Sequence, residues 1–371
     1  MTGDENLAEE LRSGYTTGAC AAAGVKAALL YERGEHAERV ELVALDGTRL
    51  WIPVEKVREE GEGIVAEIVK FSGDDPDITN GVSVFTKIRH LENGAGIRFL
   101  AGDGVGHVTK HGLSVPVGEP AVNPGPRQLI RNVVEELLGR EAGLEVTISI
   151  PAGKELARRT LNPVLGVEGG ISVIGTTGVL HPMSEEAFRK SLVPQIDVAQ
   201  AAGFSSLIFV PGKIGEKIAL AYGLPGEAIV QTSNFIGYLL EAAAKRKVNR
   251  ILLFGHIGKL AKVAAGVFYT HNRIGDGRLE AMAAYAAAEG LPQEGVQRVL
   301  EAAATEDAMA VIEQYHAEAV YGRLAKRASE RAERYVFHEL EIGTVMVTLD
   351  GRILGMDRRA EEIGREFGWK L

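Results

Sequence analysis

Apolar residues recur along this chain with two different periods. Between residues 38 and 71 the segments ERVELVAL, RLWIPV and IVAEIVKF alternate apolar and polar positions, which predicts strands with one buried face. The pair Asp46-Gly47 between the first two segments predicts a tight hairpin. Beyond residue 170, short apolar runs are instead each followed by a glycine turn and a helical pattern. That second rhythm is typical of a parallel sheet.

Residues 251–273, ILLFGHIGKLAKVAAGVFYTHNR, show the second pattern most clearly. The apolar run at the start predicts a buried strand, and the turn 255–258 ends it. The residues after the turn predict a helix with one apolar face, formed by Leu260, Val263, Ala264 and Val267. Such a turn exposes amide groups at the positive end of a helix dipole, which suits an anionic or nucleotide-like ligand. An ordinary strand-to-helix corner has the same pattern, so both interpretations stay open.

The order of the predicted elements indicates two domains. Residues 1–153 contain one helix, many strands, a second helix and a last strand, which is an α+β arrangement. Residues 154–332 begin with a crossover segment and continue as an α/β domain with a mainly parallel sheet. Residues 333–371 add a hairpin around Asp350-Gly351 and a terminal helix, which we expect to pack on one of the two domains.

Ligands of parallel sheets bind at the carboxyl ends of the strands. We expect residues 171–174 and 207–210 to be strands of the same sheet as residues 251–254. The glycine turns that follow these strands should therefore meet at one edge: 175–178, 211–215 and 255–258. We expect the acidic loop of the first domain to converge on the same crevice. This half contains neither the dinucleotide-binding fingerprint nor the phosphate-binding P-loop motif.

Composition and charge narrow the class of protein. The formal net charge of −9 argues against a nucleic acid or an acidic membrane as partner. No apolar run approaches the roughly 20 residues that span a bilayer, and the acidic N-terminus lacks the pattern of a signal peptide. The single cysteine, Cys20, excludes an intrachain disulfide and favours the cytoplasm. Self-association into a homo-oligomer stays open.

Two segments of the first domain combine candidate chemistry with a structural alternative. In RSGYTTGAC, Thr16 or Thr17 can cap a helix or offer a hydroxyl to a ligand. Cys20 lies in the first turn, where the dipole lowers a thiol pKa, although a small buried cysteine is the more common case. In the loop GDDPDITNG (73–81), the carboxylates can handle substrate or hold a metal, but the same residue types also form turns.

Eight motifs together resemble the CbiD family, the cobalt-precorrin-5B C1-methyltransferases of the oxygen-independent vitamin B12 pathway. They span most of the chain in the family's order: GYTTGAC (14–20), GDDPDITNG (73–81), EPAVNPGPR (119–127), TLNP (160–163), GGISVIGTTG (169–178), PMSEEA (182–187), QTSNFIG (231–237) and GHIGKLAKVAAGVFYTHNR (255–273). Two small departures are Ala19, where the family pattern has threonine or a similar small residue, and Gly277, where it has alanine. Neither changes the chemistry that the resemblance implies.

The resemblance implies a two-domain CbiD-like fold, S-adenosylmethionine as methyl donor, and a cobalt-bearing, ring-contracted tetrapyrrole as acceptor. The cobalt travels with the substrate, so we expect no protein-bound metal. His256, for moving a proton, and Asp77 are the candidate catalytic residues. We expect donor contacts from Gly175, Thr176, Thr177, Gly178, Ser233, Asn234, Gly255 and Gly258. We expect substrate contacts from Thr16, Thr17, Asp74, Asp75, Asn80, Lys259, Lys262 and Arg273.

Methyl transfer from a sulfonium is an in-line displacement, so alignment and exclusion of water should matter more than a strong base. Cationic groups and amides should hold the acetates and propionates of the substrate.

Two alternative functions remain. One is an acyl or thiol transferase that uses Cys20, and the other is a non-catalytic corrinoid-binding or carrier protein.

Overall fold

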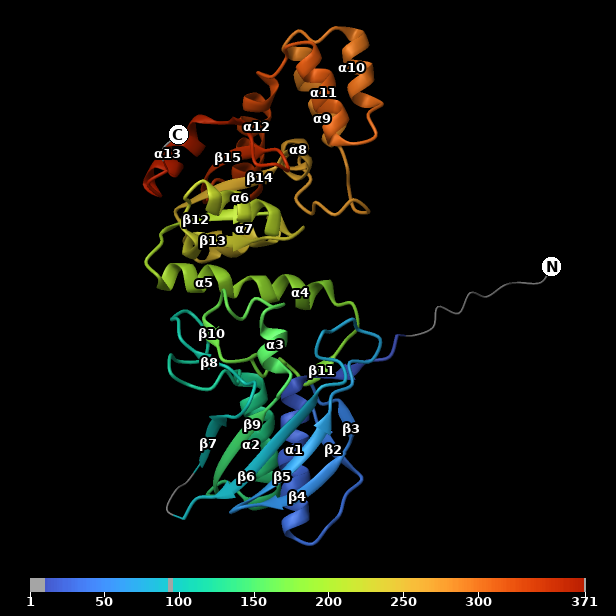
Figure 1. Cartoon of the computed structure of the whole chain (residues 1–371), viewed down its shortest axis with the longest axis vertical. Helices are drawn as coiled ribbons and strands as arrows, with labels where there is room; N and C mark the ends of the chain where they lie inside the picture. Colours follow the sequence, from blue (N-terminus) through green and yellow to red (C-terminus); the bar gives the residue numbers. More distant parts are fainter. Residues whose placement is uncertain (1–10, 93–95, 370–371) are drawn as a thin grey trace, which may run out of the picture. The chain divides into compact units, whose positions relative to one another are not determined.

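The structure is a computed structural model that describes residues 11–92 and 96–369 (Figure 1). The chain divides into two compact units, residues 1–185 and residues 186–371. Residues 1–10, where the sequence shows no signal-peptide pattern, lie outside the described residues. Within the described ranges, no helix combines the length and the apolar character needed to cross a bilayer.

The first unit is an α+β structure. Its helices are α1 (Thr17–Glu32), α2 (Pro124–Leu138) and α3 (Gly153–Ala157). Its strands are β1 (Gly14–Tyr15), β2 (Arg39–Val43), β3 (Arg49–Pro53), β4 (Lys56–Glu60), β5 (Gly63–Val69), β6 (Ser83–His90), β7 (Gly96–Ala101), β8 (His107–Val108), β9 (Gly143–Ser149), β10 (Val167–Glu168) and β11 (Val179–Leu180).

Five of these strands form one sheet in the order β4-β5-β6-β9-β7, in which only the β7–β9 pair is parallel. The alternating pattern of β6 and β9 turns Val84, Ile88 and Val146 into a core shared with α1 and α2. The small residues of α1 let it approach the sheet closely, since a Cβ atom at Gly24 would lie 2.7 Å from the Thr86 hydroxyl. The predicted hairpin at Asp46-Gly47 is confirmed as β2–β3.

Residues 171–174 do not belong to the parallel sheet. They form isolated bridges inside the first unit, where Ile171 pairs with Val105 and Val173 pairs with Val122. The expectation that they begin the parallel sheet is therefore wrong, and the turn 175–178 follows no strand of that sheet. Since β10 pairs with β8 and β11 pairs with β1, the chain stays with the first unit up to residue 185 rather than leaving it at 153.

The second unit is an α/β structure. Its strands are β12 (Ser206–Val210), β13 (Ile229–Gln231), β14 (Arg250–His256), β15 (Glu341–Val347) and β16 (Ile353–Met356). Its helices are α4 (Glu185–Leu192), which begins at the boundary, α5 (Pro194–Ala201), α6 (Lys213–Ala221), the 3-10 turn η1 (Gly226–Ala228), α7 (Ile236–Lys245), α8 (Ile257–Ala265), α9 (Arg278–Ala288), α10 (Gln293–Leu300), α11 (Thr305–Gln314), α12 (Val320–Tyr335) and α13 (Arg358–Glu366).

The sheet of this unit has the order β13-β12-β14-β15-β16, and all its neighbours are parallel except the last pair. Helices α6 and α13 share a core with one face through Ile218, Ala360 and Ile363. Helix α12 contacts both α7 and α8 on the other face, where Ser329 of α12 bonds Thr344 of β15. The two faces are thus both covered, which explains why β12 and β14 are almost continuously apolar. The predicted fold class, an α+β unit followed by a mainly parallel α/β unit, is confirmed.

Candidate active site

Strands β12 and β14 lie side by side at the centre of the parallel sheet, and the chain leaves them on opposite faces. It continues from β12 into α6 on one face and from β14 into α8 on the other. A pair of neighbouring strands with this property marks the switch point of a doubly wound sheet, where ligands bind outside the carboxyl ends. The loop 211–212 and residues 256–258, where β14 passes directly into α8, occupy that position. The expectation that the turns 211–215 and 255–258 meet is confirmed, since a Cβ atom at Gly255 would lie 2.6 Å from the Pro211 ring.

The N-terminus of α6 opens onto this switch point without a cap. Gly212 has a φ of +139° with open space where a Cβ would stand, and within the described residues no side chain bonds the first amides of α6. The first amides of a helix have no partner inside the helix, and they carry the positive end of its dipole. The arrangement therefore suits a carboxylate or another group that accepts hydrogen bonds.

Lys259, in the first turn of α8, links that helix to the loop after β12. Its Nζ atom donates a hydrogen bond of 2.9 Å to the carbonyl oxygen of Pro211. Burial, and the charge of Lys262 nearby, hold the pKa of Lys259 below its usual range. The ammonium group lies at the switch point as predicted, but one of its three hydrogens serves the protein itself.

His256 lies at the predicted turn, where its side chain caps α8. Its Nδ1 atom accepts a hydrogen bond of 3.2 Å from the amide of Gly258, so the ring proton is on Nε2, which lies 3.3 Å from Glu306. Burial lowers the pKa of His256, although Glu306 opposes the shift. The Nδ1 atom is thus occupied by the cap of α8, and a role of His256 in moving a proton stays a prediction.

Lys262 and Arg273 have different roles in the loop after α8. The side chain of Lys262 is 1 % exposed, and its Nζ atom donates to the carbonyl oxygens of Thr270 and Gly275 and to Asn272 Oδ1, at 3.4, 3.2 and 2.7 Å. It holds the loop after α8 in place and does not face solvent. Arg273, by contrast, is exposed on that loop.

The loop after β13 carries the two other predicted donor contacts. Ser233 has a φ of +53°, a left-handed conformation that is uncommon for a residue other than glycine and often marks functional sites. The carbonyl oxygen of Asn234 accepts from the amide of Thr270, which fixes the loop after α8 against the loop after β13. The amide of Thr232 bonds the last residue of β12, Val210, so this loop lies at the same edge of the sheet.

In the first unit, the threonines of GYTTGAC are structural. Thr16 caps α1 as predicted by accepting from the amide of Ala19, and the amide of Gly18 donates to the carbonyl oxygen of Ile174. The hydroxyl of Thr17 accepts a hydrogen bond of 3.0 Å from the amide of Ile174. The donors at this helix start thus already have partners within the protein.

The turn 175–178 packs directly against that cap. Gly175 has a φ of +140°, and a Cβ atom there would lie 2.2 Å from the Thr16 hydroxyl. The carbonyl oxygen of Thr177 accepts from the amide of Leu45, Gly178 bonds the amide of Thr16 through its carbonyl oxygen, and Thr176 is exposed. Glycine is required here because the backbone approaches the helix start closely.

The acidic loop 73–81 uses its carboxylates to hold the chain together. Asp74 accepts from the backbone and side chain of Arg12, and Asp75 accepts from the amide of Met183. The Oδ1 atom of Asn80 accepts from the amide of Ser72. Within the described residues, no group of three or more His, Cys, Asp and Glu side chains could hold a metal ion.

Asp77 forms an ion pair of 2.9 Å with Lys70, whose side chain is almost fully buried. Burial acts to raise the pKa of Asp77, but hydrogen bonds from Thr79 and Lys70 outweigh it and hold that pKa below its usual range. Lys70 was not among the predicted site residues, because a lone lysine at the end of an alternating strand is ordinarily solvated.

Cys20 is fully buried in the first turn of α1. Burial raises the pKa of its thiol to about 12, so the expected lowering by the helix dipole is outweighed. A thiol that stays protonated in an apolar environment is not a nucleophile.

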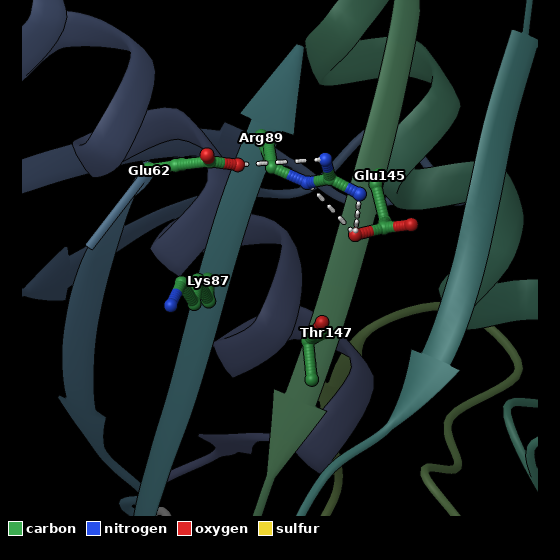
Figure 2. Close-up of a pocket in the computed structure, with 5 residues that line it drawn as sticks. All are labelled: Glu62, Lys87, Arg89, Glu145 and Thr147. Atoms are coloured by element: carbon green, nitrogen blue, oxygen red, sulfur yellow. Dashed lines mark hydrogen bonds and ion pairs between the residues drawn. The ribbon is translucent and has the colours of Figure 1, made fainter. Parts of the chain in front are cut away.

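Two surface hollows lie elsewhere. One, of about 260 Å³, lies on the outer face of the first unit's sheet, and Figure 2 shows its Arg89 between Glu62 and Glu145. Arg89 contacts these carboxylates at 3.8 and 2.9 Å, so its charge is already neutralised. The other lies at the amino ends of β14 and β15, where parallel sheets do not bind ligands.

The fold defines the class: an α+β unit followed by a doubly wound α/β unit. The chain matches the family model described as CbiD over residues 4–182 and the model described as CbiD, C-terminal domain, over residues 269–358. It is 50 % identical to the cobalt-precorrin-5B C(1)-methyltransferase of Moorella thermoacetica, over 98 % of this chain and all of the relative. The chain therefore belongs to the CbiD family.

Other relatives carry the same name. The cobalt-precorrin-5B C(1)-methyltransferase of Methanocaldococcus jannaschii is 43 % identical, over 92 % of this chain and 95 % of the relative. A crystal structure of a cobalamin biosynthesis protein (cbiD) from Archaeoglobus fulgidus is 28 % identical with a TM-score of 0.38, and the match covers 69 % of this chain and 80 % of that one.

Proposed function

We infer that this chain is a methyltransferase that uses S-adenosylmethionine to methylate C1 of the cobalt-precorrin-5B ring, giving cobalt-precorrin-6A in oxygen-independent cobalamin biosynthesis. The observation that carries this inference is the 50 % identity over 98 % of the chain to a relative of that name. The match covers 98 % of this chain and all of that relative, so it includes both units of the chain.

The proposed donor site is the switch point of the second unit. S-adenosylmethionine carries a carboxylate and ribose hydroxyls, and the uncapped amides of α6 are donors suited to the carboxylate. The polar loop residues Ser233 and Asn234 complete this proposed site. Gly255 and Gly258 are left out of it, because Gly255 lies inside β14 against the Pro211 ring and the amide of Gly258 already bonds His256. The turn 175–178 is left out of it because its glycines and Thr177 already serve the packing of the first unit.

When bound, S-adenosylmethionine supplies an electrophilic methyl group on a sulfonium. The residues of the chain contribute by holding donor and acceptor in line and by keeping water away from them. Lys259 contributes by fixing the Pro211 loop, and His256 contributes by capping α8. No base with a free lone pair is required for the displacement itself, which agrees with the occupied Nδ1 atom of His256.

The acceptor carries acetate and propionate side chains, so its site should be cationic. Arg273 is exposed at the carboxyl edge, and Lys259 has hydrogens left to donate. Lys262 contributes only by holding the loop that carries Arg273. The negative net charge of the chain argues against a nucleic acid, whereas a small anionic substrate can be held by local cations, and we place the reaction in the cytoplasm.

The test is incubation of the purified chain with cobalt-precorrin-5B and S-adenosylmethionine labelled with ¹³C in the methyl group. The expected result is a tetrapyrrole product with one additional labelled methyl group, located at C1 by NMR. A tetrapyrrole that binds the chain tightly but gains no label would support a carrier protein and would contradict the proposal.

A further inference from the structure

A row of aromatic rings lies beside the switch point of the second unit. Phe188 meets Phe235 edge to face at 5.8 Å, Phe235 stacks on Tyr269 at 4.9 Å, and Tyr269 lies 6.2 Å from His271. Aromatic pairs with such spacings stabilise one another beyond their burial. The four side chains therefore form one continuous aromatic cluster.

The backbone places this row at the carboxyl edge of the sheet. Phe235 directly follows the loop after β13, and the amide of Thr232 in that loop bonds the end of β12. Tyr269 lies on the loop after α8, which is tied to Asn234 through Thr270 and to α8 through the buried Lys262. The rings are thus held on two loops that are fastened to each other.

The row is not a closed hydrophobic core. Phe188 at its end is 51 % exposed and Tyr269 and His271 are half-buried, while Phe235 is buried and supports the rings of Phe188 and Tyr269 from below the surface. Ile214, in the first turn of α6, and Ile274, on the loop after α8, are also more than half exposed. Apolar surface left open at the ligand edge of a sheet is typical of a binding surface.

Two cations flank the row, and within residues 11–92 and 96–369 neither has a carboxylate within ion-pair distance. The guanidinium of Arg189 lies 4.8 Å above the ring of Tyr238, and its Nε atom is buried without a hydrogen-bond partner in that part of the chain. Arg273 is exposed two residues beyond His271. Aromatic surface bordered by unneutralised arginines matches a flat, apolar ring that has carboxylates on its rim.

We propose that the row Phe188-Phe235-Tyr269-His271 is the platform on which the tetrapyrrole ring lies, with Arg189 and Arg273 binding its carboxylates. The proposal rests on the proposed function, because that function supplies a ligand with both features. It places the acceptor on the aromatic side of the same carboxyl edge whose α6 amides are proposed for the donor. Among the predicted residues only Arg273 belongs to this platform.

The test uses two cobalt corrinoids that differ in charge: cobyrinic acid, whose side chains end in carboxylates, and cobinamide, whose side chains end in amides. Binding to the full chain is followed by equilibrium dialysis and the visible absorbance of the corrinoid. Phe188→Ala should weaken the binding of both corrinoids about tenfold, because ring stacking is lost. Arg189→Gln should weaken cobyrinic acid about threefold and leave cobinamide unchanged.

Matched controls separate this effect from general damage. Phe337 is 86 % exposed next to the amino end of β15, and Arg334 is exposed on α12, so Phe337→Ala and Arg334→Gln should change neither affinity. Calorimetric binding of S-adenosylhomocysteine should be the same in Phe188→Ala and the wild type.

Wild-type corrinoid affinity in Phe188→Ala would overturn the platform while leaving the proposed function standing. Loss of S-adenosylhomocysteine binding in that variant would overturn the platform too, because the row would then hold the donor. A wild-type chain that binds neither corrinoid nor the donor analogue would overturn the proposed function together with the platform.

Discussion

The ammonium group of Lys259 on α8 donates a hydrogen bond of 2.9 Å to the carbonyl oxygen of Pro211, the residue that follows β12. This single bond links the two strand ends between which the winding of the sheet changes direction. It also fixes the peptide that precedes Gly212, the residue at the uncapped start of α6. Lys259 therefore positions the amides that we propose for the donor.

Replacing Lys259 by methionine tests this positioning role. Lys259→Met keeps the length of the side chain but loses the bond to Pro211, so we expect the KM for S-adenosylmethionine to rise about tenfold, with a smaller change in kcat. Lys259→Arg should recover part of the loss because it can still donate. The control is Lys217→Met, an exposed lysine on α6, which should behave as wild type. An unchanged KM in Lys259→Met would contradict the role.

Lys262→Met should destabilise the second unit by about 2–4 kcal/mol, because three acceptors of the loop after α8 lose a charged donor. The free energy of unfolding can be measured in urea through the fluorescence of Trp369, which is buried in this unit. Hydrogen exchange should also become faster in residues 267–277. Lys245→Met, at an exposed position in the last turn of α7, is the control, and equal losses in both variants would refute the prediction.

Local patterns were sufficient to locate the turn after β14. An apolar run, a glycine turn and an amphipathic face are all read from neighbouring residues, and the structure forms β14 and α8 there. The bounds differ, because β14 continues through Gly255 to His256 and α8 ends at Ala265, before Val267. The partners of Lys262 were not readable in this way. Its acceptors lie 8 to 13 residues further along the chain, on a loop that is fixed by the bond from Thr270 to Asn234.

For residues 171–174 the local pattern predicted a strand but assigned it to the wrong sheet. Their short β-branched sequence fits a strand in any sheet, and only tertiary contacts select Val105 and Val122 as partners. The platform was missed for a related reason. Phe188, Phe235 and Tyr269 come from three separate elements, and nothing in their spacing along the sequence indicates that the rings meet.

The cap formed by His256 predicts a pH dependence of stability. The folded state favours neutral His256 because burial lowers its pKa, whereas the unfolded chain has a histidine pKa of about 6.5. The unfolded state therefore binds more protons below that pH. The cap's contribution is fully present above about pH 6.5 and is lost as the pH falls toward the lower folded-state pKa.

His256→Asn is the matched variant, since asparagine caps helices well but does not titrate in this range. Unfolding of the second unit, followed by Trp369 fluorescence, should lose less stability between about pH 7 and pH 5 in this variant than in the wild type. Parallel curves for the two proteins would show that the histidine does not titrate as proposed.

Variants of the ion pair between Asp77 and Lys70 can distinguish a structural from a catalytic role of Asp77. Asp77→Asn leaves a buried ammonium group without its counter-charge, so we expect a loss of about 3 kcal/mol in the first unit, measured by circular dichroism in urea. The double variant Lys70→Met with Asp77→Asn should recover much of that stability. Methyl transfer should recover with it if Asp77 only holds the loop, whereas a stable but inactive double variant would support the catalytic role.

Cys20→Ala should leave methyl transfer within about twofold of wild type, because a fully buried thiol with a pKa of about 12 has no thiolate to offer near neutral pH. The cost in stability should be about 1 kcal/mol, since alanine replaces a small side chain in the alanine-rich helix α1. An aromatic disulfide reagent that releases a coloured thiolate should react with the wild type only after denaturant is added. A native chain that reacts at once, or a Cys20→Ala variant that loses turnover while it remains folded, would revive the cysteine-dependent transferase. The two measurements are independent, because the first reports on access to the sulfur atom and the second on its use.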